Sequence, residues 1–596
     1  MRFFTALILL CFATTIFAQN QADTPPKITG ELKKWHKVTL TFEGPETAEN
    51  HTYNPFLNYR LNVLFTKGKT SYLVPGYFAA DGNAGETAAS KGNQWRVHFA
   101  PGAAGEWQYE VSFRKGGNIA VAERAGESAG FMDGQRGRFT IGETDKTGRD
   151  FRGKGRLQFV NKTYLQFAET GEYFLKAGVD APENALSYAD FDGNFKTDGH
   201  KDNLVKTWSA HTKDWQEGDP TWQDGKGKAL VGGLNYLASK GLNAFSFLTL
   251  NIAGDDRNVF PYVSYENYER MDVSKLDQWE ILFEHADKLG IFLHFKTSEV
   301  ENQGLLDNGD LGVQRKLYYR ELMARFGHHL ALNWNIGEEN GLWLKKDVTP
   351  WQTTTQRLAC AQYFYNKDPY RHHVVIHNGQ QFYDLLGPES KYTGLSIQTN
   401  REDFANVHGA VLRWRRLSKA AKKVWANAVD EPGDAQYSLV PDQLNPDHDN
   451  ARQNALWGAL MAGAWGVEWY FGYKNEHSDL TCEDWRSRDK MWDQCRHALA
   501  FFSDHNIPYW EMEPADDLTK NDDFVLAKTG SEYVIFQKMG EKQATVLPKL
   551  SGTFAVRWFH PKTGKFVGKA QRLTTKDQLK VGLPPQDTEQ DWVLWV

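Results

Sequence analysis

Eight short apolar segments alternate with longer stretches of helical periodicity between about residues 156 and 512. In the stretch 273–290, VSKLDQWEILFEHADKLG, apolar residues recur at the spacing of one helix face. Strand–helix units in this number close a parallel sheet on itself, so their order predicts an α/β fold, a (β/α)8 TIM barrel over 156–512. The expected strands lie at 173–180, 243–251, 291–299, 330–339, 373–379, 394–400, 423–431 and 467–473.

The regions before and after the barrel are predicted to be β-sandwiches. Runs such as VTLTF, WRVHFA and WQYEVSF alternate apolar and polar residues, which is typical of strands with one buried face. The same alternation returns after about residue 516, in FVLAK, EYVIFQK and DWVLWV. A chain of 596 residues is also too long for one core. We therefore expect an N-terminal immunoglobulin-like sandwich at 19–145 and a small C-terminal sandwich at 516–596.

Both flanking regions resemble known modules. The segments KKWHKVTLTFEGP, NPFLNYRLNVLF, YLVPGYFAADGN and WRVHFAPGAAGEWQYEVSF resemble an immunoglobulin-like domain of unknown function, the DUF5060 type, which precedes secreted bacterial glycoside hydrolase barrels. The C-terminal strands resemble a small β-sandwich described as collagen-binding that follows related barrels. The resemblance implies an exported enzyme for plant or marine algal polysaccharide, with a polysaccharide or oligosaccharide as its partner.

Charge and hydropathy exclude some other partners. The net charge of -6 gives no strongly basic face, which argues against binding to nucleic acid. After the N-terminal stretch no run of about 20 apolar residues occurs, so no membrane span is expected. The chain is rich in aromatic residues, with 21 Trp and 24 Tyr, which can stack on sugar rings as well as fill a core.

The N-terminal stretch MRFFTALILLCFATTIFAQN has one early Arg, an apolar run and small residues before Gln19. This is the pattern of a secretory signal peptide over residues 1–18, which predicts a secreted or periplasmic protein. A lipid anchor on Cys11 is the competing interpretation, but Leu9 and Leu10 stand where a small residue is expected before such a cysteine.

Cysteine and histidine spacing predicts no metal and no cofactor. Cys482 and Cys495 lie in a loop-like segment and could form one disulfide in an oxidising compartment. The pairs His328–His329 and His372–His373 are adjacent, so on a strand the two side chains of each pair would diverge. No cluster has the spacing of zinc ligands.

Two glutamates close the expected fourth and seventh strands and are the candidate catalytic pair: Glu339 in NWNIGEEN and Glu431 in VWANAVDEPGD. Strand ends of a barrel open onto one face, so side chains far apart in sequence can meet there. Cleavage of a glycosidic bond needs one carboxyl group to protonate the leaving oxygen and a second, ionised, to attack the anomeric carbon.

Strand parity is used to choose between neighbouring acids, since alternate side chains face the barrel interior. In the fourth strand Leu332, Trp334 and Ile336 form the helix-facing set, which favours Glu339 as inward and places Glu338 outward. In the seventh strand polar Asn427 suggests that its set, which includes Glu431, faces inward, and this favours Glu431 over Asp430.

The pattern resembles the retaining clan of barrel hydrolases that contains apiosidase-like enzymes, with the acid/base after strand four and the nucleophile after strand seven. The resemblance assigns Glu339 as acid/base and Glu431 as nucleophile. This sequence departs from that clan because Glu338 stands where Asn usually precedes the acid/base. Asn335, Asn340 and Gln398 are possible replacements for that Asn.

Other polar or aromatic residues of the expected strands could line the cleft. Lysines there are candidates for binding a sulfate or carboxylate, and a tryptophan could stack on a sugar. The candidate substrate-binding residues are Lys176, Asp180, His294, Lys296, His377, Asn378, Gln398 and Trp469. The segment DAPENALSYADFDGN after the first strand could form part of the cleft rim.

The leading hypothesis is a retaining glycoside hydrolase that acts by double displacement. A non-catalytic carbohydrate-binding or adhesion protein is the alternative, and release of new reducing ends from polysaccharide would discriminate the two. A polysaccharide lyase is a third class, which would need a basic residue beside a uronate and would create an absorbing double bond.

Overall fold

The computed structural model describes residues 24–195, 204–254, 257–341, 351–377, 382–540 and 543–596. The expected signal peptide at 1–18, with Cys11, and the candidate Asn378 lie outside these residues. Over the described ranges, no helix has both the length and the apolar content that crossing a bilayer requires.

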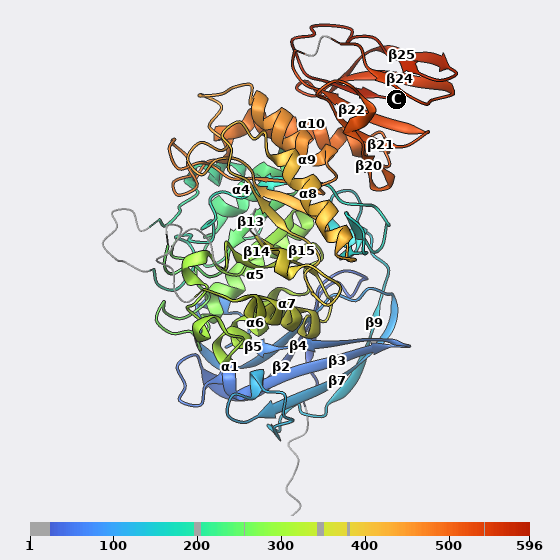
Figure 1. Ribbon diagram of the computed structural model, residues 1–596. Coiled ribbons are helices and arrows are strands. Elements are labelled where there is room, and N and C mark those ends of the chain that lie inside the picture. The colour runs from blue at the N-terminus through green and yellow to red at the C-terminus, as the bar shows by residue number, and fades with distance from the viewer. Residues whose placement is uncertain (1–23, 196–203, 255–256, 342–350, 378–381, 541–542) are drawn as a thin grey trace, which may run out of the picture.

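The centre of the molecule is a closed barrel of eight parallel strands, which confirms the predicted (β/α)8 fold (Figure 1). Seven strands lie within the predicted segments, β19 begins one residue before its segment, and each strand pairs with its neighbours in chain order. The strands are β12 (Lys176–Val179), β13 (Ala244–Leu248), β14 (Phe292–Lys296), β15 (Leu332–Glu338), β16 (His373–His377), β17 (Ser396–Gln398), β18 (Ala428–Glu431) and β19 (Gly466–Trp469).

Helices cover the barrel and return the chain to the start of each next strand. Local signals fix their ends: Asp272 caps the first turn of α5 with its side chain, and Gly290 ends that helix in the left-handed conformation. Within the described residues, the β16–β17 connection has only a short turn of 3-10 helix at Tyr383–Leu385. The main helices are α4 (Lys228–Ser239), α5 (Val273–Leu289), α6 (Val313–Phe326), α7 (Thr354–Lys367), α8 (Val407–Ala420), α9 (Gly458–Met461) and α10 (Asp489–Ser503).

The N-terminal region is a sandwich of two antiparallel sheets, as predicted. One sheet has the order β1-β2-β6-β5, and the other has the order β4-β3-β7-β8 with β9 paired to β7. The strands are β1 (Lys27–Thr29), β2 (Val38–Ala48), β3 (Tyr59–Lys67), β4 (Thr70–Pro75), β5 (Tyr77–Phe78), β6 (Lys91–Phe99), β7 (Gly105–Lys115), β8 (Glu127–Ser128) and β9 (Arg136–Ile141), with short helices α1 (Pro55–Asn58), α2 (Ala84–Thr87) and α3 (Phe151–Lys154). A hairpin of β10 (Leu157–Phe159) and β11 (Leu165–Phe167) leads into the barrel.

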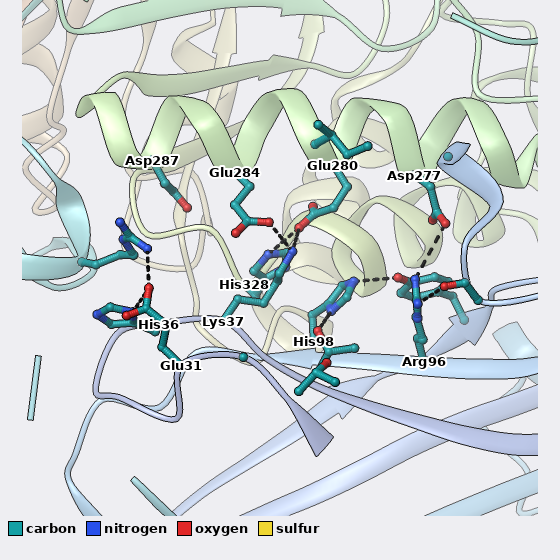
Figure 2. A pocket seen from close by; sticks show the side chains of 18 of the residues that line it. Glu31, His36, Lys37, Arg96, His98, Asp277, Glu280, Glu284, Asp287 and His328 are labelled. Atoms are coloured by element: carbon teal, nitrogen blue, oxygen red, sulfur yellow. Dashed lines mark hydrogen bonds and ion pairs between the residues drawn. The ribbon is translucent and has the colours of Figure 1, made fainter. Parts of the chain in front are cut away.

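The sandwich is docked on helices α5 and α6 of the barrel. Figure 2 shows charged side chains of α5 facing the first sheet, where Lys37 Nζ lies 2.9 Å from Glu280 Oε1 and 2.6 Å from Glu284 Oε2. Arg325 of α6 donates to the backbone oxygen of Phe78 at 3.1 Å. Since one continuous apolar cluster also joins the buried residues of both parts, the sandwich is an integral part of the barrel's packing.

The C-terminal region is a second sandwich, at the opposite end of the barrel in Figure 1, which again agrees with the prediction. It has an apolar core of its own, unlike the N-terminal sandwich. A six-stranded sheet, β20-β21-β22-β27-β24-β25, packs with the pair β23-β26. The strands are β20 (Glu513–Pro514), β21 (Phe524–Lys528), β22 (Glu532–Gln537), β23 (Val546–Leu547), β24 (Gly552–His560), β25 (Lys565–Thr575), β26 (Leu579–Lys580) and β27 (Trp592–Trp595).

A buried ion pair joins this sandwich to the barrel. The Arg452 guanidinium donates to both carboxylate oxygens of Asp591, at 2.7 and 2.8 Å, and neither side chain is exposed. Removing Asp591 would leave the buried Arg452 with Asp449, 2.6 Å from Nη2 and 35% exposed, as its remaining carboxylate partner, so the bidentate part of the charge compensation would be lost.

Asp591→Ala should therefore lower the free energy of unfolding by about 2–3 kcal/mol, measured by urea denaturation. Glu511→Ala is the matched control, because it breaks an ion pair with Lys528 whose side chains are 47% and 45% exposed; its effect on the free energy of unfolding should be much smaller, because solvent screens exposed pairs. Equal effects of the two substitutions would contradict a structural role for the buried pair.

Candidate active site

The ends of β15, β17 and β18 bring both predicted catalytic glutamates to one amide group. Gln398 Nε2 donates to Glu339 Oε1 at 2.8 Å and to Glu431 Oε1 at 3.0 Å. Because both bonds end on one nitrogen, the two carboxylate oxygens are at most 2.8 plus 3.0, or 5.8 Å, apart. The sequence prediction that these side chains meet at the barrel mouth agrees with this geometry, and Gln398 lies between them.

Glu431 has a second partner in His377, another residue expected at the cleft. His377 Nε2 lies 2.8 Å from Glu431 Oε2, and His377 Nδ1 lies 2.9 Å from Ser396 Oγ. Burial, together with the charge of Lys296, lowers the pKa of His377 to about 4, so the ring is neutral at pH 7. With Glu431 ionised, the shared proton is then on Nε2, and His377 donates it to the carboxylate.

Glu338 faces the barrel interior, so the prediction from parity that it points outward is wrong. Its Oε1 lies 3.1 Å from Lys296 Nζ, and the residue is 3% exposed. The pairing of β15 with β16 shifts register between Asn335 and Glu338, and Glu339 has a left-handed φ of 48°. This bulge breaks the alternation, so two consecutive glutamates turn into the mouth.

In the seventh strand the parity argument also gave the wrong direction for Asp430. Asp430 faces inward, where its Oδ1 lies 2.7 Å from Lys176 Nζ, while Trp425 stacks on Trp414 of α8 in the helical layer. Glu431 still reaches the mouth because β17 and β18 shift register just before Gln398 pairs with it. The preference for Glu431 therefore rested on a wrong parity, although the residue lies at the expected place.

Lys296 ends β14 and is surrounded by carboxylates. Its Nζ lies 2.8 Å from Asp180 Oδ1 and 3.1 Å from Glu338 Oε1, and it also bonds Glu183. Burial, and next to it the charge of Glu183, raise the pKa of Glu338 well above its usual range. Burial likewise raises the pKa of Asp180. These carboxyl groups thus favour the protonated form.

Glu183 was not among the predicted site residues. It belongs to the acidic segment after β12 that the sequence indicated as a possible cleft rim, and its position in that loop gave no periodic signal. Its backbone N–H donates to Asp479 Oδ1 at 3.1 Å, which connects the loops after the first and eighth strands.

A second polar layer lies deeper in the barrel, and it contains two predicted substrate-binding residues. Lys176 Nζ contacts Glu468 Oε1 at 2.8 Å in addition to Asp430, and His294 Nδ1 lies 2.6 Å from Glu468 Oε2. Asn335 Nδ2 lies 3.0 Å from His294 Nε2. Lys176 and His294 are fully buried and paired with these groups, so the structure places them in the barrel core rather than in the cleft.

Trp469 is also turned away from the mouth, contrary to the prediction of a sugar platform. Its indole Nε1 donates to Cys495 Sγ of α10 at 3.2 Å, and the side chain is fully buried. The residue pairs in register with Val179, on the helix-facing parity of β12. The Cys482–Cys495 disulfide, which the sequence left open, is not formed, since both thiols are free and buried.

Among the residues that the structure describes, two sets of three side chains at the mouth are close enough to hold a metal ion. In each set one ligand atom per residue lies within 4.8 Å of the other two; the sets are Glu338, His377 and Glu431, and Asp180, Glu183 and Glu431. Lys296 already contacts Glu338, and His377 is hydrogen-bonded to Glu431, so both carboxyl groups have partners in the protein. That the protein needs no metal and no cofactor remains a prediction.

Comparisons with domain families match the two ends of the chain. Residues 31–114 match a family described as "Domain of unknown function (DUF5060)". Residues 514–596 match one described as "Putative collagen-binding domain of a collagenase". Both resemblances seen in the sequence are thereby confirmed. A comparison with curated proteins gave no significant match.

Solved structures share the fold. A Bacteroides vulgatus protein described as a "putative glycoside hydrolase" has a TM-score of 0.62 at 16% identity, covering 95% of this chain and 99% of its own. A family 5 glycoside hydrolase from the same species has a TM-score of 0.52 at 14% identity, covering 74% of this chain and 93% of its own. A third, described as "Glycoside hydrolase", also reaches 0.52 at 14% identity, covering 76% and 98%. At these identities the likeness concerns the fold.

The neutral state of His377 predicts a pH dependence of stability. Its folded pKa of about 4 lies below the unfolded value of about 6.5, so the stability linked to it is present above pH 6.5 and is lost as pH falls towards 4. His377→Gln keeps an N–H donor without titrating. Between pH 7 and 4.5, the free energy of unfolding of the variant should fall by about 2 kcal/mol less than that of the wild type, measured by urea unfolding.

His329→Gln is the control of opposite sign. Burial opposes protonation of His329, but Glu280 and Asp287 outweigh it and raise the pKa to about 10. The stability from this imidazolium is full below pH 6.5 and is lost as pH rises towards 10. In this variant the free energy of unfolding should therefore fall less than in the wild type as pH rises towards 10. A change confined to acid pH, like that expected for His377→Gln, would contradict the raised pKa of His329.

Proposed function

We propose that this protein is a retaining glycoside hydrolase with Glu431 as nucleophile and Glu339 as acid/base. The observation that carries the proposal is the contact of both carboxylates with Gln398 Nε2, at 2.8 and 3.0 Å. A separation of about 5–5.5 Å between the carboxyl groups is typical of retention, whereas inverting enzymes leave room for a water. The described solved structures with this fold carry glycoside hydrolase names, which supports the same class.

Glu431 has the surroundings of a nucleophile. Two N–H donors, from His377 and Gln398, bind its two oxygens, and hydrogen bonds to a carboxylate favour the ionised form. In the first step Glu431 attacks the anomeric carbon, forming a glycosyl ester as the bond to the leaving oxygen breaks.

Glu339 has the position of an acid/base. It is partly exposed, whereas Glu338 is 3% exposed and tethered to Lys296. A group that protonates a departing alcohol and then activates water must reach both, which favours the residue nearer the solvent. In the second step Glu339 takes a proton from water, which attacks the ester and releases Glu431.

Glu338, which precedes the acid/base in the chain, then has the role of hydrogen-bonding the sugar. Its raised pKa favours the protonated form, and a neutral carboxyl group can donate a hydrogen bond as the Asn of related barrels does. The same raised pKa makes Glu338 the rival candidate for the acid, so the test must separate the two residues.

We also propose export and a polysaccharide substrate from plants or marine algae. The apolar N-terminal stretch supports export, and the resemblance to secreted bacterial enzymes of this domain order supports the substrate class. The alternative is a non-catalytic carbohydrate-binding protein. Binding to a panel of such polysaccharides without any new reducing ends would favour that alternative.

The roles of the glutamates predict different kinetics on aryl glycosides. Glu339→Ala should lower kcat/KM about 100-fold to 10,000-fold on substrates with poor leaving groups and far less on dinitrophenyl glycosides, which need no acid. Azide should rescue it and give a glycosyl azide of retained configuration. Glu431→Ala should be inactive on both substrates.

Glu338→Gln is the matched control for Glu339→Ala. If Glu339 is the acid, the control should keep the leaving-group dependence of the wild type. Azide rescue of Glu338→Ala instead of Glu339→Ala would transfer the acid role to Glu338. Activity of Glu431→Ala would exclude double displacement through that residue.

A further inference from the structure

A groove between the N-terminal sandwich and the barrel is lined by four cationic side chains. Its volume is about 510 Å³, within the range of about 300–1,000 Å³ that is typical of ligand sites. Arg60 belongs to β3 of the sandwich, whereas Arg320 of α6, Lys367 of α7 and Arg371 of the loop before β16 belong to the barrel. The groove lies where α6 packs beside β4 (Figure 1), so both modules are needed to form it.

Arg320 is fixed by one nitrogen of its guanidinium and leaves the others open. Nη2 donates to the backbone oxygen of Leu61 at 2.7 Å and to Asn62 Oδ1 at 3.1 Å. Within the described part of the chain, Nε and Nη1 have no hydrogen-bond partner, and both are accessible to solvent. Glu321, the next residue, is bound to Arg325 at 3.0 Å. One edge of the Arg320 fork is therefore available to a ligand.

Arg371 is a second guanidinium that no carboxylate holds among the described residues. It lies 4.7 Å from the centroid of the Tyr365 ring, and it is exposed to solvent. It precedes β16, so the groove is at the end of the barrel opposite the mouth.

Arg60 adds a third guanidinium, which has a structural role in the sandwich. Its Nη1 and Nη2 donate to four backbone oxygens of the loop after β7, those of Ile119, Ala122, Arg124 and Ala125. These neutral acceptors satisfy its N–H groups but leave its positive charge without a carboxylate partner.

The acidic residues that line the groove are already bound elsewhere. Glu123 Oε1 lies 2.9 Å from Lys367 Nζ, and the Glu123 side chain is 80% exposed. Asp368 is buried and accepts a hydrogen bond from Trp334 Nε1 at 3.0 Å, in the helical layer of the barrel. The groove is therefore locally basic, although the whole chain has a net charge of -6.

The two inner guanidiniums pay an electrostatic cost for their position. Burial lowers the pKa of Arg60 and of Arg320, because desolvation disfavours the charged form. The charge of Arg60 lowers the pKa of Arg320 further. Charges removed from water are normally paired in proteins, so an anion in the groove would supply the missing partner.

Apolar surface lies beside these charges. Leu73 of β4 is 56% exposed and Tyr365 of α7 is 37% exposed, and both line the groove. Leu73 and Pro75 share one face of β4, since alternate side chains of a strand point the same way. A ligand with anionic groups and an apolar C–H surface is complementary to this arrangement, and an acidic sugar has both.

We propose that this groove binds an acidic polysaccharide, whose carboxylate or sulfate groups pair with Arg320 and Arg371. The planar fork of a guanidinium suits such oxyanions, because it can donate two parallel hydrogen bonds. The choice of a sugar polymer rests on the proposed function, to which the groove adds a second binding site remote from the cleaved bond. Two linked sites on one polymer bind it more tightly than either alone, which gives the N-terminal sandwich a role in holding substrate.

Affinity electrophoresis in gels that contain a polysaccharide tests the proposal. Every chain carries Glu431→Ala, so that the polymer is not digested during the run. Polygalacturonate supplies carboxylates, carrageenan supplies sulfates, and a neutral β-glucan is the reference. The Kd for the better acidic polymer should be about tenfold or more below that for the β-glucan, and added salt should raise it. Equal Kd values for acidic and neutral polymers would overturn the inference.

Variants of the groove locate the binding. Arg371→Gln should raise the Kd for the acidic polymer about fivefold or more, and Arg320→Lys should raise it as well, because it keeps the charge but loses the fork. Glu123→Gln should lower the Kd about twofold, since it removes a competing carboxylate. Arg496→Gln, at an ion pair of α10 whose arginine is 47% exposed, is the control and should leave the Kd unchanged.

An unchanged Kd in both Arg371→Gln and Arg320→Lys would contradict the inference, as would weaker binding by Glu123→Gln. Arg371 is exposed and makes no hydrogen bond among the described residues, so its variant tests the proposal even if Arg320→Lys does not fold.

Release of reducing ends by the wild type from the same polymers separates this inference from the proposed function. Release by the wild type, combined with a Kd that the groove variants leave unchanged, would contradict the second site alone. Binding that depends on Arg371, without release from any polysaccharide tested, would support the groove and contradict the glycosidase proposal.

Discussion

The burial of a lysine ammonium inside the barrel is the constraint on which the site depends. Lys296 comes from β14, and a buried ammonium costs several kcal/mol unless carboxylates surround it. The carboxylate of Glu183 compensates this charge, and carboxyl oxygens of Asp180 and Glu338 also contact Nζ, so groups from the first and fourth strand ends fix these parts of the mouth relative to one another. Lys176 does the same one layer deeper for the seventh and eighth strands.

This charged interior explains how the candidate catalytic groups acquire different properties within a few ångströms. Glu431 receives two N–H donors, which favour its ionised form, while Glu338 is buried beside another carboxylate, which favours protonation. Environments that push the pKa values of neighbouring acids apart are what acid and nucleophile chemistry at neutral pH requires.

The two sandwiches have different relations to this barrel. The N-terminal one shares an apolar core with it and adds ion pairs through Lys37, so it serves as part of the scaffold that holds α5 and α6. The C-terminal one has a core of its own, and it also adds residues such as Phe536 and Phe559 to the apolar cluster of the barrel, next to the Arg452–Asp591 pair.

Much of the architecture followed from local pattern. The barrel strands lie in the predicted segments to within one residue, because short apolar runs and helical spacing are properties of the residues themselves. The meeting of Glu339 and Glu431 was also predictable, since strand ends of a barrel share one face. The direction of side chains was less predictable. Strand alternation correctly placed Asn335 in the barrel interior but gave the wrong direction for Glu338 and Asp430, because strict alternation ends at a bulge.

The sequence by itself therefore determined the elements, their order and the two glutamates that close the fourth and seventh strands. The tertiary structure decided which neighbouring acid turns inward, that Trp469 packs against α10, and that both lysines are held by carboxylates from other strands. The physical reason is that periodicity is encoded within each segment, whereas the direction and charge state of a side chain depend on contacts between segments far apart in the chain.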